Sequence, residues 1–195
     1  AAVPPAYYDE IRAELADEFG ENADYRIHTQ FAFGYRGERI NTMLEELAPH
    51  SAATFQQIHG DNYDGSAAEL LPFFADLSID DADLSDMRDW LVNWDYQMHM
   101  DSPQAALWAN TWVALVDNLF QDNLGDIGAR GGNNEWWAAY LLAQDPENAW
   151  WDDVNTADIV ETRDDILLRS LQDGVNTTTE ALGADRDAWA WGTLH

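Results

Sequence analysis

Apolar residues recur at spacings of three and four along most of this 195-residue chain. A repeat of this length gathers apolar side chains on one face of an α-helix, whereas a half-buried strand needs alternation. The clearest helical segments are Ile40, Met43, Leu44 and Leu47; Leu84, Met87, Leu91 and Trp94; and Trp108, Trp112, Leu115 and Leu119. The sequence therefore predicts a mainly α fold in which several amphipathic helices share one core.

Two of the predicted helices carry recognisable end signals. Ser102 followed by Pro103 is typical of an N-cap and a first helical residue, and this helix should run to about Phe120. A last helix is predicted from about Thr162 to Leu182, because Gly183 is the type of residue that ends a helix. Gly174 lies inside this segment and should weaken it.

Strand signals are few and lie near the two ends of the chain. Residues 25–33 mix aromatic and polar side chains, and residues 188–194 (AWAWGTL) alternate large and small side chains. The Gly-rich segment 125–134 (GDIGARGGNN) is expected to be a surface loop, and it lacks the Gly-Lys-Ser/Thr ending of a phosphate loop. We therefore predict an irregular multi-helix domain with short strands near its ends.

The charge of the chain is strongly one-sided. Thirty-seven acidic residues face nine arginines and no lysine, which gives a formal net charge of −28. Such a surface repels itself at low ionic strength but is screened in molar salt, which indicates a protein from a halophilic archaeon or bacterium. Nucleic acid is excluded as a partner because phosphate binding needs clustered basic residues. No apolar run is long enough to cross a bilayer, so no membrane insertion is predicted.

Taken singly, the residues that could carry chemistry give weak signals. The histidines show no HExxH spacing, there is no cysteine, and adjacent acidic residues are expected by chance in so acidic a chain. No metal site and no cofactor are therefore predicted. The adjacent tryptophans at 136–137 and 150–151 are interpreted as core residues, with a stacking platform for a ligand as the alternative.

Several short segments, taken in order, resemble the β subunit of the penicillin acylase family of N-terminal-nucleophile hydrolases. The segments are FAFGYRGERI at 31–40, FQQI at 55–58 with Asp61, AAELLP at 67–72, LVNWD at 91–95, WWDD at 150–153, Glu161-Thr162 and WAWGTLH at 189–195. The resemblance covers residues 25–195 and rests on the order of the segments, since each alone is common.

The resemblance implies an amidase in which an N-terminal serine attacks the amide carbonyl, with its own α-amine as base. Ala1 offers no nucleophile, and the asparagine that holds the oxyanion in the family would fall upstream of it. The chain is therefore expected to be a helical part of the β subunit, cut from a parent with an αββα core, and to be inert alone. Residues 1–34 would form an irregular lead-in, residues 35–183 the helical part, and residues 184–195 the start of a strand returning to the catalytic sheet.

Two site residues follow from the resemblance. Arg39 matches the family arginine that supports the oxyanion asparagine and meets the polar end of the substrate, which makes it the predicted catalytic residue. Phe33 matches an aromatic residue that lines the acyl pocket and is the predicted substrate-binding residue. Without the resemblance, Arg39 would be interpreted as a helix-start arginine paired with Glu45 or Glu46. No metal ligand follows, because His28, Thr29 and Gln30 stand where the family has a calcium carboxylate.

The predicted partners are the remaining α and β portions of the parent acylase and a linear amide with an apolar acyl group. Members of the family are often exported, so the resemblance implies an extracellular or cell-surface protein. Two alternatives stay open at this point. One is a non-catalytic helical interaction module that keeps the scaffold of the family, and the other is an unrelated helical domain that binds a ligand with its paired tryptophans.

Overall fold

The computed structural model describes residues 13, 16, 34–129 and 131–194, and confirms the mainly helical prediction. The α-helices are α2 (Tyr35–Glu46), α3 (Ala52–Gly60), α4 (Gly65–Ala75), α5 (Ala82–Val92), α6 (Pro103–Leu124), α7 (Asn133–Ala143) and α8 (Arg163–Leu182). Short 3-10 helices cover Gly125–Ile127, Ala149–Trp151, Arg186–Ala188 and Trp191–Thr193. Within the described residues, the only extended pairing is a single antiparallel bridge between Tyr63 and Gln97.

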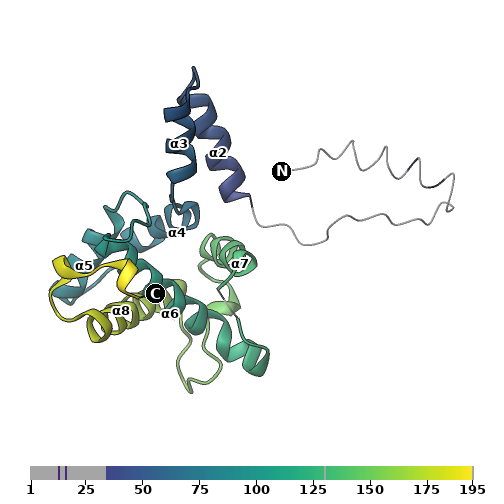
Figure 1. The fold of residues 1–195 in the computed structure, drawn as a ribbon. Helices are drawn as coiled ribbons and strands as arrows, with labels where there is room; N and C mark the ends of the chain where they lie inside the picture. Colours follow the sequence, from purple (N-terminus) through teal and green to yellow (C-terminus); the bar gives the residue numbers. More distant parts are fainter. Residues whose placement is uncertain (1–12, 14–15, 17–33, 130, 195) are drawn as a thin grey trace.

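The long helices α6 and α8 pack along each other and form the centre of the body in Figure 1. Their contact faces are buried, with Thr111, Leu115 and Leu119 of α6 and Ile166, Leu167 and Leu171 of α8 inaccessible or nearly so. The helices α4, α5 and α7 add further apolar side chains to this core, whereas α2 and α3 project from the body as a pair (Figure 1). The core therefore sits below the base of the α2–α3 pair.

Gly174 lies where α8 passes very close to the backbone of α6. A Cβ atom built on Gly174 would lie 2.7 Å from the Thr111 Cα and 2.8 Å from the Thr111 backbone nitrogen. These distances leave no room for any side chain, so the glycine that should weaken the last helix is the residue that lets the two helices meet. The Thr178 hydroxyl, beside it, donates to the Gly174 carbonyl at 2.7 Å and accepts from the Asn110 amide at 2.9 Å.

The predicted starts of α6 and α8 and the predicted end of α8 are confirmed, whereas the end of α6 differs. The Ser102 hydroxyl accepts from the backbone N–H of Ala105 at 3.2 Å, and Pro103 opens α6, which continues to Leu124 rather than ending near Phe120. Thr162 and Asp165 form a reciprocal capping box at the start of α8, and Gly183 ends the helix with φ of +94°.

The strand predicted at residues 188–194 does not form. This segment instead contains the last residue of the 3-10 helix Arg186–Ala188 and the whole of the 3-10 helix Trp191–Thr193. The second of these lies against the start of α6, where the Gly192 N–H donates to the Met100 carbonyl at 2.7 Å. Trp189 is buried, its ring meets Trp90 at 6.2 Å, and its Nε1 donates to the Gly183 carbonyl at 2.7 Å. The alternation therefore reflects tryptophans anchored on helices. The other predicted strand, at 25–33, lies outside the described residues.

Arginines link segments that are distant in the sequence. Arg88 of α5 donates to the Leu77 carbonyl at 2.7 Å, just past the end of α4, and Arg163 donates to the Ala143 carbonyl at 3.0 Å, at the end of α7. Both contacts supply acceptors at helix ends with a charged donor. Arg186 pairs with Asp86 and lies over the Trp90 ring at 5.1 Å. These scarce cations act as cross-links between helices.

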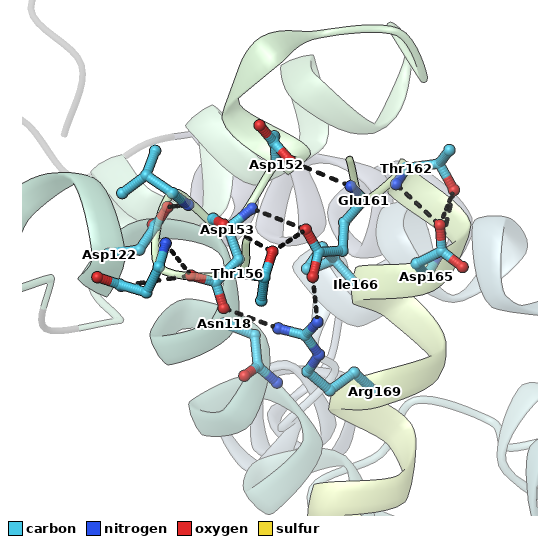
Figure 2. A network of polar contacts seen from close by, with 12 residues as sticks. Asn118, Asp122, Asp152, Asp153, Thr156, Glu161, Thr162, Asp165, Ile166 and Arg169 are labelled. Atoms are coloured by element: carbon cyan, nitrogen blue, oxygen red, sulfur yellow. Dashed lines mark hydrogen bonds and ion pairs between the residues drawn. The ribbon is translucent and has the colours of Figure 1, made fainter. Parts of the chain in front are cut away.

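A polar network around Arg169 holds the loop that precedes α8, and Figure 2 shows it from close by. The guanidinium donates to Glu161 Oε1 at 2.7 Å and to Asp153 Oδ2 at 3.1 Å. The second oxygen of Glu161 accepts from the Thr156 hydroxyl at 3.0 Å, and only 4% of the Glu161 side chain is exposed. The Glu161 N–H in turn donates to Asp152 at 3.1 Å. A buried carboxylate with this many donors is held in its ionised form.

Acid should unfold the protein through this network. Burial opposes ionisation of Glu161, but the hydrogen bonds from Arg169, Thr156 and the backbone outweigh it, and its pKa lies below the ordinary value. The pKa of Asp153 is lowered as well, chiefly by the Asn155 backbone N–H, against a burial cost, with help from Arg169. A carboxyl group with a lowered pKa stabilises the fold above its unfolded pKa, near 4, and this stability is lost as the pH falls through the folded pKa.

We expect Glu161→Gln to reduce the free energy of unfolding at pH 7 by about 1–3 kcal/mol, because it leaves Arg169 facing an amide. Since the variant lacks the titrating group, its stability should fall less between pH 5 and pH 3 than that of the wild type. Urea unfolding in molar NaCl tests this, because salt suppresses the general repulsion that acid would otherwise relieve. Glu180→Gln, at an exposed position of α8, is the matched control. Equal pH slopes for the wild type and Glu161→Gln would contradict the expectation.

Candidate functional site

The candidate site is built on the α2–α3 pair. Arg39 lies in the second turn of α2, and α3 runs back toward the body after a capping box in which Ser51 and Thr54 satisfy each other's backbone N–H groups. Helix α3 ends at Gly60, and the chain turns to an extended conformation at Asp61. This geometry places the Asp61 side chain opposite Arg39, although the two residues are 22 positions apart.

Arg39 and Asp61 form a two-point ion pair. Nε of Arg39 donates to Asp61 Oδ2 at 2.9 Å, and Nη2 donates to Asp61 Oδ1 at 2.8 Å. The guanidinium carbon also lies 4.7 Å from the centre of the Tyr63 ring. Such a pairing fixes the plane of the guanidinium as well as its position. Among the described residues, Arg39 forms no ion pair with Glu45 or Glu46, although the charge of Glu46 helps to raise its pKa.

The charges at this pair are well defined. The hydrogen bond from Arg39 lowers the pKa of Asp61, even though burial opposes this, and the same hydrogen bond raises the pKa of Arg39. Burial raises the pKa of the Tyr63 hydroxyl. At neutral pH the site therefore presents a carboxylate, a guanidinium and a neutral phenol.

Backbone pairing holds the segment that carries Asp61 and Tyr63. The Met98 N–H donates to the Asn62 carbonyl at 3.1 Å, and the Asp64 N–H donates to the Tyr96 carbonyl at 2.8 Å. Tyr96 has φ of +62°, an uncommon conformation for a residue with a side chain, and its ring meets Tyr63 edge-on at 5.9 Å. The residues facing Arg39 are thus fixed by main-chain hydrogen bonds.

Asp64 ties this segment to the core. Its Oδ1 accepts from the backbone N–H groups of Ser66 at 3.0 Å and Ala67 at 3.1 Å, which caps α4. Its Oδ2 accepts from Trp108 Nε1 of α6 at 3.0 Å. One carboxylate therefore joins the start of α4, the central helix and the segment beside Arg39.

A cavity of about 870 Å³ opens next to the ion pair, between α2 and α6. Most of its wall is apolar, and the apolar residues include Ile40, Met43, Ile58, Trp108, Trp112 and Val113. Arg39 and Asp61 lie in the same lining, and 30% of the Arg39 side chain is exposed against 11% for Asp61. Within the residues that the structure describes, Nη1 of Arg39 donates no hydrogen bond. The site is thus an apolar cavity with a fixed cation that retains hydrogen-bonding capacity.

Comparison with known proteins identifies the family to which the chain belongs. Residues 13–195 match the family model described as penicillin amidase. The chain belongs to the penicillin amidase family. Arg39, its partner Asp61 and the residues that line the cavity all lie within the matched range.

Relatives within the penicillin amidase family match about half of the chain. Acyl-homoserine lactone acylase QuiP of Pseudomonas fluorescens strain Pf-5 is 33% identical over 114 residues, which cover 54% of this chain and 14% of the relative. The proteins of the same name from Pseudomonas putida and Pseudomonas aeruginosa are 43% identical over 103 residues and 30% identical over 116 residues. These cover 48% and 55% of this chain and 12% and 14% of the relatives. The chain thus spans a small part of the length of these amidase relatives.

The two predicted site residues fare differently. Arg39 lies at the cavity, as described above, whereas Phe33 falls outside the described residues.

The adjacent tryptophans, which were predicted to be core residues, differ in their surroundings. Trp151 is a buried core residue whose Nε1 donates to the carbonyls of Leu142 and Asp145, but Trp136 lines the cavity and Trp150 is 39% exposed.

Sequence reasoning missed the roles of Tyr63, Asp64 and Trp108. One signal was available, because Asp64 precedes the segment GSAAELL and an aspartate in that position is a common N-cap. The other two roles depend on contacts between separate helices. No described group of three or more His, Cys, Asp or Glu side chains is placed to hold a metal ion, and no described helix is long and apolar enough to span a membrane.

Proposed function

We propose that this chain supplies one wall of the active site of an amidase that hydrolyses linear amides with an apolar acyl group. The observation that carries the proposal is Arg39, held at two points by Asp61 in the lining of a largely apolar cavity. Membership of the penicillin amidase family supports the reaction type. The relatives named acyl-homoserine lactone acylases support an acyl-bearing substrate.

In the proposed reaction, the hydroxyl oxygen of an N-terminal serine, on a segment outside these residues, attacks the amide carbonyl carbon. The serine's α-amine takes the hydroxyl proton and then passes it to the departing amine nitrogen as the C–N bond breaks. Water attacks the resulting ester and releases the carboxylic acid and the serine. Arg39 would support the group that holds the oxyanion and contact the polar end of the substrate, while the cavity receives the acyl chain.

The chain by itself would then be inactive, and its partners would be the other portions of the acylase. In this proposal the apolar wall binds the acyl chain, and the fixed guanidinium orients the polar end of the substrate. Burial of an acyl chain contributes about 0.8 kcal/mol for each methylene group, so longer acyl chains should bind more tightly until the cavity is full. The charge at the rim fixes which end of the substrate meets the nucleophile.

The test is hydrolysis by the complete protein that contains this chain, measured with a series of N-acyl anilides of increasing chain length. We expect kcat/KM to rise with chain length and then level off, and the isolated 195-residue chain to show no turnover. Mass spectrometry of the denatured enzyme, quenched during turnover, should place the acyl group on another segment. An acyl group on a residue of this chain would contradict the proposal. Loss of hydrolysis with every anilide, combined with binding of the acyl amides, would favour a non-catalytic module.

A further inference from the structure

Tyr96 follows the segment LVNWD at residues 91–95 and adopts a backbone conformation that tyrosine rarely takes. Its φ is +62°, in the left-handed region where a Cβ atom is crowded and where glycine or asparagine is the usual residue. Within the described part of the chain, the other non-glycine residue of this kind is Asp158, and aspartate is enriched in that conformation. Tyr96 is therefore the outlier, and such an outlier points to a function for its side chain.

The Tyr96 ring links Tyr63 to the core. It meets the Trp94 ring at 5.8 Å between ring centres and 70° between ring planes, and Trp94 is buried. It also meets the Tyr63 ring, at 5.9 Å and 89°. Both contacts have the edge-to-face geometry that aromatic pairs prefer. Tyr63 is thus supported by a ring that is itself packed on a core tryptophan.

Tyr63 supports the Arg39 guanidinium from one face. The guanidinium carbon lies over the Tyr63 ring, 4.7 Å from its centre, whereas the ion pair with Asp61 uses the edge formed by Nε and Nη2. A ring against the face of the guanidinium opposes its tilting about that edge. The position of the Tyr63 ring therefore controls where Nη1, the part outside the ion pair, points.

The turn at Tyr96 also brings its neighbour Gln97 to the ion pair. Gln97 forms the antiparallel bridge with Tyr63, and its amide Nε2 donates to Asp61 Oδ1 at 3.4 Å. This is the oxygen that accepts from Nη2 of Arg39. The left-handed step at Tyr96 thus sets its own ring against Tyr63 and the next side chain against Asp61.

We infer that Tyr96 is a positioning residue that holds the Arg39 guanidinium in its working orientation through Tyr63. The inference rests on the proposed function and adds a residue that is not in the lining of the cavity. The strained backbone is tolerated because the turn must carry an aromatic ring, which glycine cannot supply. A tyrosine that served only to form the turn could be replaced without any effect on the orientation of Arg39.

The first test is steady-state hydrolysis of an N-acyl anilide by the complete protein in molar NaCl. Tyr96→Asn removes the ring but tolerates the left-handed backbone, and kcat should fall by about threefold to tenfold, with KM within about twofold, as loss of an aromatic contact predicts. Tyr96→Phe keeps the ring and should retain kcat. Asp158→Asn is the matched control, because it places the same residue in the same backbone conformation away from the cavity, and it should leave both constants unchanged.

A second measurement reports on the guanidinium directly and needs no turnover. Phenylglyoxal reacts with accessible guanidinium groups, and mass spectrometry of the digested protein gives the labelling rate of each arginine. Arg39 should label about threefold faster in Tyr96→Asn than in the wild type or Tyr96→Phe, because its contact with Tyr63 is weakened. Arg169 is the internal standard, since 35% of its side chain is exposed against 30% for Arg39 and it pairs with other carboxylates.

Circular dichroism verifies the fold of each variant, and Tyr96→Gly, which relaxes the backbone, replaces Tyr96→Asn if the latter does not fold. The inference is overturned if removal of the ring leaves the Arg39 labelling rate or the kcat of an active enzyme unchanged. It is also overturned if Tyr96→Phe loses as much as Tyr96→Asn, or if Arg39 and Arg169 label faster alike. Failure of the proposed amidase would appear separately, as absent hydrolysis by the wild type with the difference in Arg39 labelling retained.

Discussion

Arg39→Ala in the complete protein that contains this chain is expected to lower kcat/KM of the proposed amidase for an acyl amide by tenfold or more. This loss corresponds to about 1.4 kcal/mol or more of transition-state stabilisation. The reason is that the guanidinium is already fixed by Asp61 and Tyr63, so in the proposed role it would meet developing charge without reorganising. Steady-state kinetics with an N-acyl anilide measure the effect. Unchanged kinetics in Arg39→Ala would remove the role proposed for this residue.

Two further variants separate the effect of the orientation of the Arg39 guanidinium from the effect of its charge. Arg39→Lys keeps the charge but cannot make the two-point contact with Asp61, and should recover only part of the activity. Asp61→Asn leaves the guanidinium in place but removes the carboxylate that orients it, and is expected to reduce kcat more than it changes KM. Glu45→Gln is the control, since Glu45 is exposed on the same helix and makes no contact with Arg39. Equal losses in Glu45→Gln and Asp61→Asn would indicate a general effect of surface charge.

Gly174→Ala is expected to destabilise the fold by about 2 kcal/mol or more, although alanine is the better helix former by about 1 kcal/mol. The new methyl group would overlap the Thr111 backbone on α6, which cannot move without shifting the helix. Denaturant unfolding in molar salt measures the change in free energy. The same substitution at Gly37 of α2 meets nothing within 4 Å and should be neutral or slightly stabilising.

A gain in stability for Gly174→Ala would show that α6 and α8 can separate at small cost. Shortening the neighbour by Thr111→Ala should not rescue the variant, because the Thr111 Cα and backbone nitrogen remain in place. This pair of results distinguishes an overlap between helix backbones from simple crowding of side chains.

Much of the helical framework could be predicted from local signals. Ser102, Pro103, Thr162 and Gly183 act on backbone groups within a few positions of themselves, so their roles are readable from the sequence. Gly174 shows the limit of such reasoning. Its low helix propensity is a local property, whereas its fit against Thr111 depends on where another helix passes.

The candidate site illustrates the same limit. Arg39 could be singled out from its motif, but its partner could not. Depending on the fold, Arg39 could pair with Glu45, Glu46 or Asp61, since all three are carboxylates. The choice is made by the end of α3, which turns the chain so that Asp61 faces α2. Likewise the alternation at residues 188–194 is typical of a strand, but Trp189 finds its contacts on α5 and at the end of α8.

The arginine contacts described above act over a much shorter distance than the repulsion between surface carboxylates. In these contacts the donors of Arg39, Arg88, Arg163 and Arg169 lie between 2.7 and 3.0 Å from their nearest acceptors, with no room for an ion between them. At about 1 M salt the reach of an exposed charge shrinks to roughly 3 Å. Dissolved ions therefore screen the long-range repulsion between carboxylates and leave the direct arginine contacts almost unchanged. Concentrated salt thus weakens the long-range repulsion between carboxylates but keeps the direct arginine contacts that hold the helices together.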